Sequence, residues 1–488
     1  MKSFICTLFF LQAFLFAQPS PDYKQYFIDQ TMRIDYFHIG SMNEELISMD
    51  RIYGYGTWAG SLNNLIDNLN NGKYYHKIYD AATNKLIYSK GFDTFFGEYV
   101  TSRDGRDGVR RSFHESAIIP YPKSKIIFSM EKREESNEMT EIFRTEIDPA
   151  SIYINKDKIT DASVEIFKPV FNGNPHNKVD IAILAEGYTE NEKDKFAADL
   201  NRFVEYFFED EPYKSNKSDF NIYGVFKPSE ESGTDLPGAD IFVNTVLNTS
   251  FWTLGSERYL MTEDNKSMRD LAAHVPYDAI YIQVNHPRYG GGGIYNQYCT
   301  YTTDNQFAKY LFVHEFGHSF SGLADEYYTS DVSYTDFYKP SVEPIEPNIT
   351  ALLDPENIKW KDMLNEGVEV PNPWNKKEFD EMSFIWLKER NRLNTYISEL
   401  KRNRAPESEI AAAEEEYAVK DKAQSEKVDQ YLQNNKYWNK VGAFEGAGYQ
   451  ATGLYRPMLD CIMFSKGDKP FCKVCAAAIK KVINSYTE

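Results

Sequence analysis

The chain has 488 residues, of which 42% are hydrophobic and 15% aromatic, so it is longer than one ordinary domain and can build large buried cores. Its formal net charge of −19 argues against nucleic acid or an anionic membrane surface as a partner. No stretch reaches the ~20 apolar residues that a bilayer span needs, so we expect no stable membrane insertion.

The amino-terminal end is typical of an export signal. Lys2 precedes an apolar run over residues 4–16, and Ala17 offers a cleavage site before Gln18. We therefore expect residues 1–17 to be a signal peptide. The mature protein is expected in the periplasm, at the cell surface or outside the cell.

Strand-like runs rich in tyrosine and isoleucine fill the next part of the chain. They span residues 74–79, 86–88, 118–119, 125–130, 141–147 and 152–154. Proline and polar turns separate them, and residues 81–84 are typical of a hairpin turn. This spacing predicts an N-terminal all-β sandwich domain over residues 18–165. Because this part has no recognisable ligand or nucleophile motif, we expect it to pack against the rest of the chain or to position substrate.

From Val179 onwards the pattern changes to alternating strands and helices. Apolar runs at 179–184, 220–226 and 279–284 predict buried strands, and Phe196 begins the apolar face of an amphipathic helix. We therefore predict a second domain over residues 166–488 of the α/β or α+β class.

Four consecutive glycines lie upstream of the central motif, in Tyr289-Gly-Gly-Gly-Gly-Ile-Tyr295. A phosphate-binding loop is a weak interpretation because no Lys-Ser or Lys-Thr follows. We expect instead an extended segment whose bare backbone can pair with a substrate strand. A mobile loop remains the alternative.

The central motif is His-Glu-x-x-His at residues 314–318. Positions i and i+4 share one face of a helix, so His314 and His318 can present imidazole nitrogens to one ion. Two neutral histidines with a carboxylate and one open position suit a catalytic Zn²⁺, whose bound water has a pKa of about 7. Glu315 is placed to take a proton from that water. Thr303-x-x-Gln306 predicts a capping box at the start of the helix.

The third ligand is expected just beyond the helix. Gly322 can end the helix and reverse the chain, which brings Asp325 and Glu326 within reach. The shorter side chain has one fewer rotatable bond to immobilise, so Asp325 is the favoured ligand. Glu326 is then expected to orient a ligand histidine. Gly317, inside the motif, leaves room for a close neighbour.

A helical hairpin is predicted over residues 376–432. Apolar residues recur every seven positions in two runs, and Ala405-Pro406 separates the runs. We expect an inserted antiparallel pair of helices that projects from the second domain, with its ends near Trp374 and Tyr437 close together.

The last part of the chain contributes further candidates. Tyr455, with Arg456 as the alternative, is a candidate for polarising the carbonyl of the scissile bond. Met463 is expected either in a turn beneath the metal, as in metzincins, or as an ordinary core residue.

Four cysteines remain once the signal peptide is set aside: Cys299, Cys461, Cys472 and Cys475. Cys472-x-x-Cys475 has no partner motif for a second zinc site, so we expect a disulfide or buried thiols. The favoured disulfide joins Cys461 to Cys472 or Cys475.

These residues carry a resemblance. HEFGHSFSGLADEY, together with EGYT, YGGGGIYN, YRP-x-x-DCIM and FCKVC, resembles the IgA peptidase family of secreted bacterial zinc metallopeptidases. The resemblance covers nearly the whole chain, since the N-terminal β domain is also similar to that of the family. It implies a zincin-like catalytic domain with one catalytic Zn²⁺ held by His314, His318 and Asp325, and with Glu315 as the base.

The sequence also departs from known patterns. The third ligand falls one residue later than in the metzincin pattern HExxHxxGxxH/D, and the hairpin at 376–432 does not match the core of the family. No feature indicates a preference for immunoglobulin.

The sequence therefore predicts a secreted zinc-dependent endopeptidase that acts on protein or peptide substrates by a zinc-bound water activated by Glu315. The alternatives are a zinc amidase or other non-peptide hydrolase, and a non-catalytic binding or adhesion protein that keeps the fold. A non-catalytic relative is expected to lack Glu315 or a ligand, and here all are present.

Overall fold

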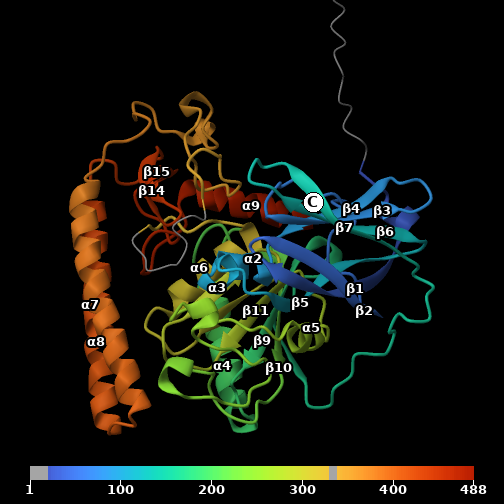
Figure 1. The fold of residues 1–488 in the computed structure, drawn as a ribbon, viewed down its shortest axis with the longest axis horizontal. Coiled ribbons are helices and arrows are strands. Elements are labelled where there is room, and N and C mark those ends of the chain that lie inside the picture. Colours follow the sequence, from blue (N-terminus) through green and yellow to red (C-terminus); the bar gives the residue numbers. More distant parts are fainter. Residues whose placement is uncertain (1–19, 329–337) are drawn as a thin grey trace, which may run out of the picture.

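The computed structural model describes residues 20–328 and 338–488, so the expected signal peptide lies outside the described residues. A strand-rich N-terminal region is followed by a larger region of mixed strands and helices (Figure 1). This confirms the expected two-domain, mixed α and β layout. Among the described helices, none combines the length and hydropathy that a membrane span requires.

The N-terminal region contains two antiparallel sheets with orders β2-β1-β5 and β4-β3-β6-β7. The strands are β1 (Phe27–Ser41), β2 (Glu44–Tyr55), β3 (Tyr74–Asp80), β4 (Leu86–Phe92), β5 (Arg111–Pro122), β6 (Ile126–Arg133) and β7 (Met139–Ile147). Ile34 and Ile119 of the first sheet share one apolar core with Ile78 and Phe128 of the second. Each sheet therefore buries one face against the other.

Two details of the N-terminal prediction were wrong. Residues 152–154 form a turn, in which the side chains of Ile152 and Tyr153 are 89% exposed because no neighbouring strand covers them. The region also holds three short helices, so it is not entirely β. These are α1 (Tyr23–Tyr26), α2 (Phe95–Thr101) and α3 (Arg103–Arg106). Thr94 and Ser102 start the last two by accepting hydrogen bonds from backbone N–H groups.

The second region is built on a six-stranded sheet of order β12-β13-β11-β9-β10-β8. Its strands are β8 (Glu165–Val170), β9 (Val179–Glu186), β10 (Phe220–Phe226), β11 (Ala279–Val284), β12 (Gly291–Ile294) and β13 (Tyr298–Thr302). The four inner strands are parallel, and the edge strands β8 and β12 are antiparallel to their neighbours. The continuous apolar run of β9 follows from this arrangement, because helices cover both faces of the sheet.

Alternate residues of β9 divide between two cores. Ile181 and Ile183 face α4 (Lys193–Phe207), α6 (Ala308–Ser321) and α9 (Lys473–Thr487). Ala182 and Leu184 face α5 (Asn265–Ala272). The helix that carries the central motif therefore lies against one face of the sheet, beside the glycine-rich edge strand β12.

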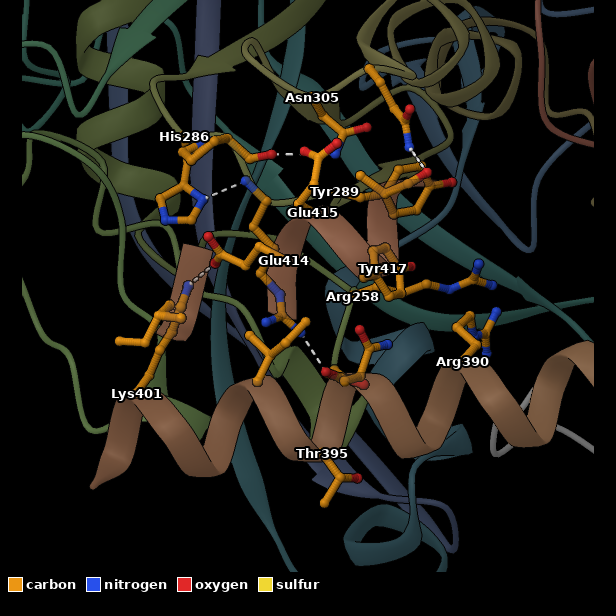
Figure 2. Close-up of a pocket in the computed structure, with 18 of the residues that line it drawn as sticks. Arg258, His286, Tyr289, Asn305, Arg390, Thr395, Lys401, Glu414, Glu415 and Tyr417 are labelled. Carbon is orange, nitrogen blue, oxygen red and sulfur yellow. Dashed lines mark hydrogen bonds and ion pairs between the residues drawn. The ribbon is translucent and has the colours of Figure 1, made fainter. Parts of the chain in front are cut away.

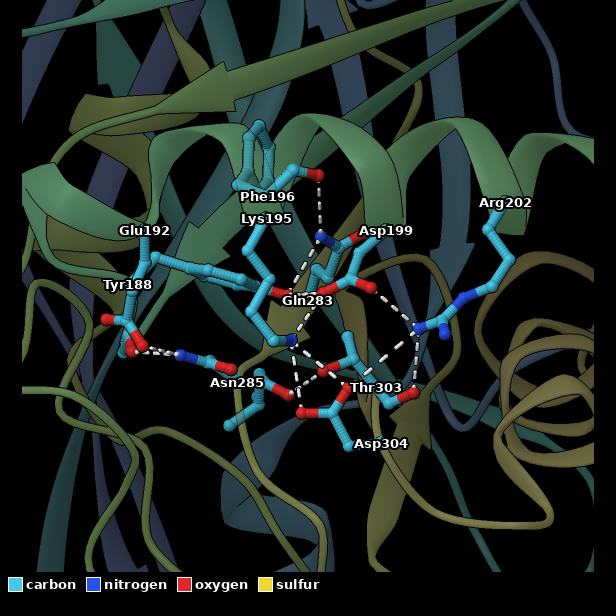
Figure 3. Close-up of polar contacts among 12 residues, drawn as sticks. Tyr188, Glu192, Lys195, Phe196, Asp199, Arg202, Gln283, Asn285, Thr303 and Asp304 are labelled. Atoms are coloured by element: carbon cyan, nitrogen blue, oxygen red, sulfur yellow. Dashed lines mark hydrogen bonds and ion pairs between the residues drawn. The ribbon is translucent and has the colours of Figure 1, made fainter.

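The start of α6 differs from the prediction. The hydroxyl group of Thr303 donates to the carbonyl of Val284 at 3.3 Å and caps no helix. The helix begins at Ala308, and its first turn receives no side-chain cap. The Thr303 loop is instead held by a polar network with α4, in which Arg202 donates to the Thr303 carbonyl at 2.9 Å and to Asp199 at 2.7 Å (Figure 3).

Helices α7 (Lys376–Arg402) and α8 (Glu407–Gln433) form an antiparallel pair along one side of the second region (Figure 1). The hairpin does not simply project. At its base, Phe379 and Leu432 belong to the main core, whereas near its tip Ile397 packs in a separate small cluster. The Gln306 side chain also donates to the carbonyl of Ala418 at 2.9 Å. The base of the hairpin is therefore part of the domain.

The chain ends with the hairpin of β14 (Phe444–Ala447) and β15 (Gln450–Arg456), followed by α9. All four cysteines in the described part of the chain are buried free thiols, so the favoured disulfide is absent. The sulfur atoms of Cys461 and Cys475 lie 3.8 Å apart, well beyond the ~2.05 Å of a disulfide bond.

Candidate active site

Helix α6 and the segment after it bring three potential metal ligands together. The Nε2 atoms of His314 and His318 are 3.2 Å apart, and Asp325 Oδ1 lies 3.1 Å and 3.2 Å from them. Ligand atoms bound tetrahedrally to zinc at 2.0–2.1 Å lie about 3.3 Å from one another. The donor set therefore fits one Zn²⁺ ion.

Backbone carbonyls orient both imidazole rings. His314 Nδ1 donates to the carbonyl of Ile462 at 2.9 Å, and His318 Nδ1 donates to that of Leu323 at 2.6 Å. Because Nδ1 carries the hydrogen in each ring, Nε2 can present a lone pair toward the other ring and Asp325. Two such nitrogens at this distance repel one another unless a cation or a proton lies between them.

Electrostatics at the site agree with cation binding. Burial lowers the pKa of His318, but attraction and hydrogen bonding to Asp325 outweigh it and raise that pKa to about 9. Burial raises the pKa of Asp325, but His318 and His314 together hold it well below its ordinary value. The carboxylate is thus ionised, and a divalent cation can replace the proton that the imidazole holds.

The turn after α6 places Asp325. Gly322 has a left-handed φ of 62° and ends the helix, with its N–H donating to the carbonyl of His318 at 3.0 Å. Asn348 then fixes the next residues, because its side chain accepts from the N–H of Ala324 and donates to its carbonyl, both at 2.8 Å. The second oxygen of Asp325, Oδ2, accepts a hydrogen bond from the hydroxyl group of Tyr449.

Glu326 lies away from this site. Its side chain is fully buried, and Oε1 accepts from the Asn348 amide at 3.1 Å and from the thiol of Cys475 at 3.2 Å. It contacts neither histidine, so the expectation that it orients a ligand was wrong. Consecutive side chains of an extended segment point in opposite directions, which separates Glu326 from Asp325.

Glu315 faces the same cavity from α6, packed under the glycine-rich edge strand. A Cβ atom at Gly291 would lie 3.1 Å from Glu315 Cγ, and one at Gly293 would lie 2.5 Å from the Glu315 carbonyl oxygen. Only glycine allows the strand to approach the helix this closely. Burial is the largest influence on the Glu315 carboxyl and raises its pKa.

Part of the outer edge of β12 is already paired. The N–H of Gly291 donates to the carbonyl of Arg258 at 3.4 Å, and its carbonyl accepts from the N–H of Leu260 at 3.3 Å. Backbone groups of an antiparallel strand alternate in direction, so Gly293 is the next residue whose groups face this edge. A substrate strand can therefore pair with β12 at Gly293 and no further along, because the next outward carbonyl, that of Tyr295, accepts from the N–H of Asp93 at 2.9 Å.

Seven tyrosines of the described part of the chain line this cavity, whose volume is about 180 Å³. The tyrosines are Tyr259, Tyr289, Tyr295, Tyr310, Tyr327, Tyr338 and Tyr449. Among the described lining residues, Arg258 is the one lysine or arginine, and it donates to the hydroxyl group of Tyr327 at 3.2 Å. Sequence reasoning missed Tyr449, which has a left-handed φ of 63° at the turn between β14 and β15.

Tyr455, the predicted carbonyl-polarising residue, does not line the cavity. It lies at the other end of β15, where its backbone pairs with Thr350 and its ring packs against the main core. Arg456 is also unsuitable, because it is fully buried and donates to the carbonyl of Gly446 at 2.7 Å. The β14–β15 turn places Tyr449, rather than Tyr455, beside Asp325.

Met463 lies beneath the motif helix. Its backbone carbonyl accepts from the N–H of Glu326 at 2.8 Å, and its sulfur would lie 2.9 Å from a Cβ atom at Gly317. Gly317 thus leaves room for this side chain. Met463 is a buried core residue within a turn below the helix, so ordinary core packing is confirmed, and a turn beneath the metal stays a prediction.

A larger cavity of about 910 Å³ adjoins the first and shares Ser256, Arg258 and Tyr289 with it (Figure 2). The helical hairpin forms one wall of this cavity, and Arg390 of α7 and Tyr417 of α8 point into it (Figure 2). The hairpin therefore borders the space next to the histidine pair.

The N-terminal region also reaches the site. Asp93 and Glu98 lie in the wall of the smaller cavity. Asp93 is held there by two backbone hydrogen bonds, since its N–H donates to the carbonyl of Tyr295 at 2.9 Å and its carboxylate accepts from the N–H of Lys73 at 2.7 Å. The N-terminal region thus contributes two acidic residues, Asp93 and Glu98, to the wall of the smaller cavity.

Two family models match the chain. One, described as IgA Peptidase M64, matches residues 169–483, and the other, described as Peptidase M64 N-terminus, matches residues 22–144. Among curated proteins, none matches the chain. The first match contains the motif helix, the hairpin and the cysteine-rich end, and it extends over more than half of the chain.

Proposed function

The chain belongs to the IgA peptidase M64 family and is a peptidase, and from this premise we propose that it is a zinc-dependent endopeptidase acting on protein substrates. The observation that carries the proposal is the convergence of two histidine nitrogens and one carboxylate oxygen within 3.1–3.2 Å, beside Glu315. This set matches a catalytic zinc site with one open position.

His314, His318 and Asp325 would hold the ion. A bound Zn²⁺ would lower the pKa of a water ligand to about 7 and polarise the carbonyl group of the substrate. Glu315 is the general base, which takes a proton from the attacking water and returns it to the nitrogen of the leaving group. Its raised pKa suits this exchange, because the carboxyl group must hold the proton between the two steps.

The chain also offers groups for holding the substrate. An extended peptide can pair with β12 at Gly293 and run into the cavity beside the hairpin. Arg258 is the residue we assign to stabilising negative charge on the carbonyl oxygen, because among the described residues that line the smaller cavity it is the one lysine or arginine. We also propose that the protein acts after export.

The test is hydrolysis of casein and of a peptide library by the purified protein starting at Gln18. We expect cleavage that a zinc chelator abolishes and added zinc restores. Cleavage that survives complete zinc removal, or unchanged cleavage by a zinc-loaded Glu315→Gln variant, would refute the proposal.

A further inference from the structure

A second group of potential metal ligands lies beneath the active site. Cys461, Cys472, Cys475 and Glu326 are all buried, and one ligand atom of each lies within 4.8 Å of the others. The residues come from three segments: the extended stretch after α6, the turn before Met463, and the first turn of α9.

The distances within the cluster fit tetrahedral zinc. Ligand sulfur atoms at 2.3 Å from zinc lie about 3.8 Å apart, and a sulfur and a carboxylate oxygen lie about 3.5 Å apart. In the structure Cys461 Sγ and Cys475 Sγ are 3.8 Å apart. Glu326 Oε1 lies 3.2 Å from Cys475 Sγ and 4.0 Å from Cys472 Sγ.

The Glu326 carboxylate lacks a sufficient partner. The residue is 0% exposed, and its Oε2 atom has no hydrogen-bond partner among the described residues. The nearby Arg456 guanidinium donates to the carbonyls of Gly446 and Leu459 instead. A buried carboxylate oxygen without a partner costs free energy, and a cation among the thiols would remove that cost.

Backbone N–H groups point at two of the sulfur atoms. The N–H of Cys472 donates to Cys461 Sγ at 3.1 Å, and the N–H of Cys475 donates to Cys472 Sγ at 3.4 Å. Cys472 also occupies the N-cap of α9, where the helix dipole favours negative charge. These contacts favour a thiolate at Cys472, the form in which cysteine binds metal.

We propose that Cys461, Cys472, Cys475 and Glu326 bind a second Zn²⁺ ion with a structural role. Three thiolates select soft or borderline cations, and the carboxylate favours zinc over the softer copper(I). Four protein ligands close the coordination shell, as in structural rather than catalytic zinc sites. The site could not be predicted from the sequence, because its fourth ligand comes from Glu326 and not from a second CxxC motif.

The position of this site links it to the catalytic histidines. Glu326 follows the ligand Asp325, and its N–H donates to the carbonyl of Met463. Cys461 precedes Ile462, whose carbonyl accepts the hydrogen bond that orients His314. A metal that joins these two segments would hold the supports of the first site in place.

The test is metal content and zinc K-edge X-ray absorption of the exported, purified protein. We expect two zinc ions per chain and a sulfur shell at about 2.3 Å, beside the nitrogen and oxygen ligands at 2.0–2.2 Å. The double variant His314→Ala, His318→Ala should keep one zinc with three sulfur ligands. One zinc per wild-type chain without sulfur ligands, or a Cys461–Cys475 disulfide by mass mapping, would overturn the proposal.

Substitutions within the cluster complete the experiment. Glu326→Gln keeps the shape of the side chain and all three thiols, and it should lower the affinity for one of the two zinc ions at least tenfold. Cys299→Ser is the matched control, because Cys299 is an equally buried thiol outside the cluster, and it should leave both ions bound. If wild type lacks the sulfur shell, the proposal fails whether or not the variants fold.

Discussion

Tyr449→Phe tests whether the hydrogen bond to Asp325 fixes the third ligand. The hydroxyl group of Tyr449 donates to Asp325 Oδ2, while Oδ1 faces the two histidines. Removing the hydroxyl leaves a buried carboxylate oxygen without this donor, which typically costs about 1–3 kcal/mol. Loss of a group that orients a metal ligand weakens metal affinity about 10–100-fold, which is about 1.4–2.8 kcal/mol and agrees with that range.

The assay is zinc affinity by chelator competition, with turnover of a peptide measured at saturating zinc. We expect Tyr449→Phe to bind zinc about 10–100-fold more weakly and to recover most of its turnover when zinc is in excess. Tyr455→Phe is the matched control on the same hairpin, since Tyr455 does not line the cavity, and both quantities should stay unchanged. A loss in Tyr455→Phe without one in Tyr449→Phe would refute the reasoning.

Three further predictions concern the base, the hairpin and the N-terminal region. Glu315→Gln should keep its zinc and lose about 10²–10⁴-fold in turnover, as measured by metal analysis beside casein hydrolysis. Replacing residues 391–418 by a short glycine/serine linker should preserve cleavage of small peptides and reduce cleavage of proteins, because this part of the hairpin lines the large cavity and the base that belongs to the core remains. Burial lowers the pKa of His38, but Glu115 and Glu45 outweigh burial and raise that pKa above 6.5. The contribution of protonated His38 to the stability of the fold is therefore complete below pH 6.5 and is lost as the pH rises through the folded-state pKa. Burial raises the pKa of Glu45, but His38 outweighs burial and holds that pKa at about 2 instead of 4.5. The contribution of ionised Glu45 to the stability of the fold is therefore complete above pH 4.5 and is lost as the pH falls toward 2. The difference in melting temperature between wild type and Glu45→Gln should therefore be largest between pH 4.5 and 6.5, and a difference independent of pH would contradict this.

Features that depend on local periodicity could be predicted from the sequence. The strands at 220–226 and 279–284 have the expected bounds, because continuous apolar runs in a parallel sheet leave little ambiguity. The helix face shared by His314 and His318, and its end at Gly322, follow from helical spacing and the left-handed conformation that glycine permits.

Pairing between residues far apart in the sequence explains why one strand, β1, was not predicted. Strand β1 was missed because its polar residues hide the alternation of a buried strand. Arg33 and Asp35 are both buried there and pair at 3.0 Å, and His38 pairs with Glu115 of β5 at 3.0 Å. The His38–Glu115 pair forms only once β1 and β5 are together, and burial of the Arg33–Asp35 pair also depends on the folded sheet, so a count of apolar positions along β1 does not detect this strand.

Asp325 and Glu326 illustrate how adjacent residues acquire different roles. The sequence could rank them only by side-chain length, since both follow the same glycine turn. In the folded chain the segment is extended, so the first carboxylate points to the histidines and the second to the three thiols. Inserting or deleting one residue between Gly322 and Asp325 would exchange the directions of the two carboxylates. If both groups bind metal, such a change should weaken zinc binding at both sites together, because each carboxylate would have the wrong length and position for its new site, whereas a substitution of Glu326 alone should leave the histidine site able to bind zinc.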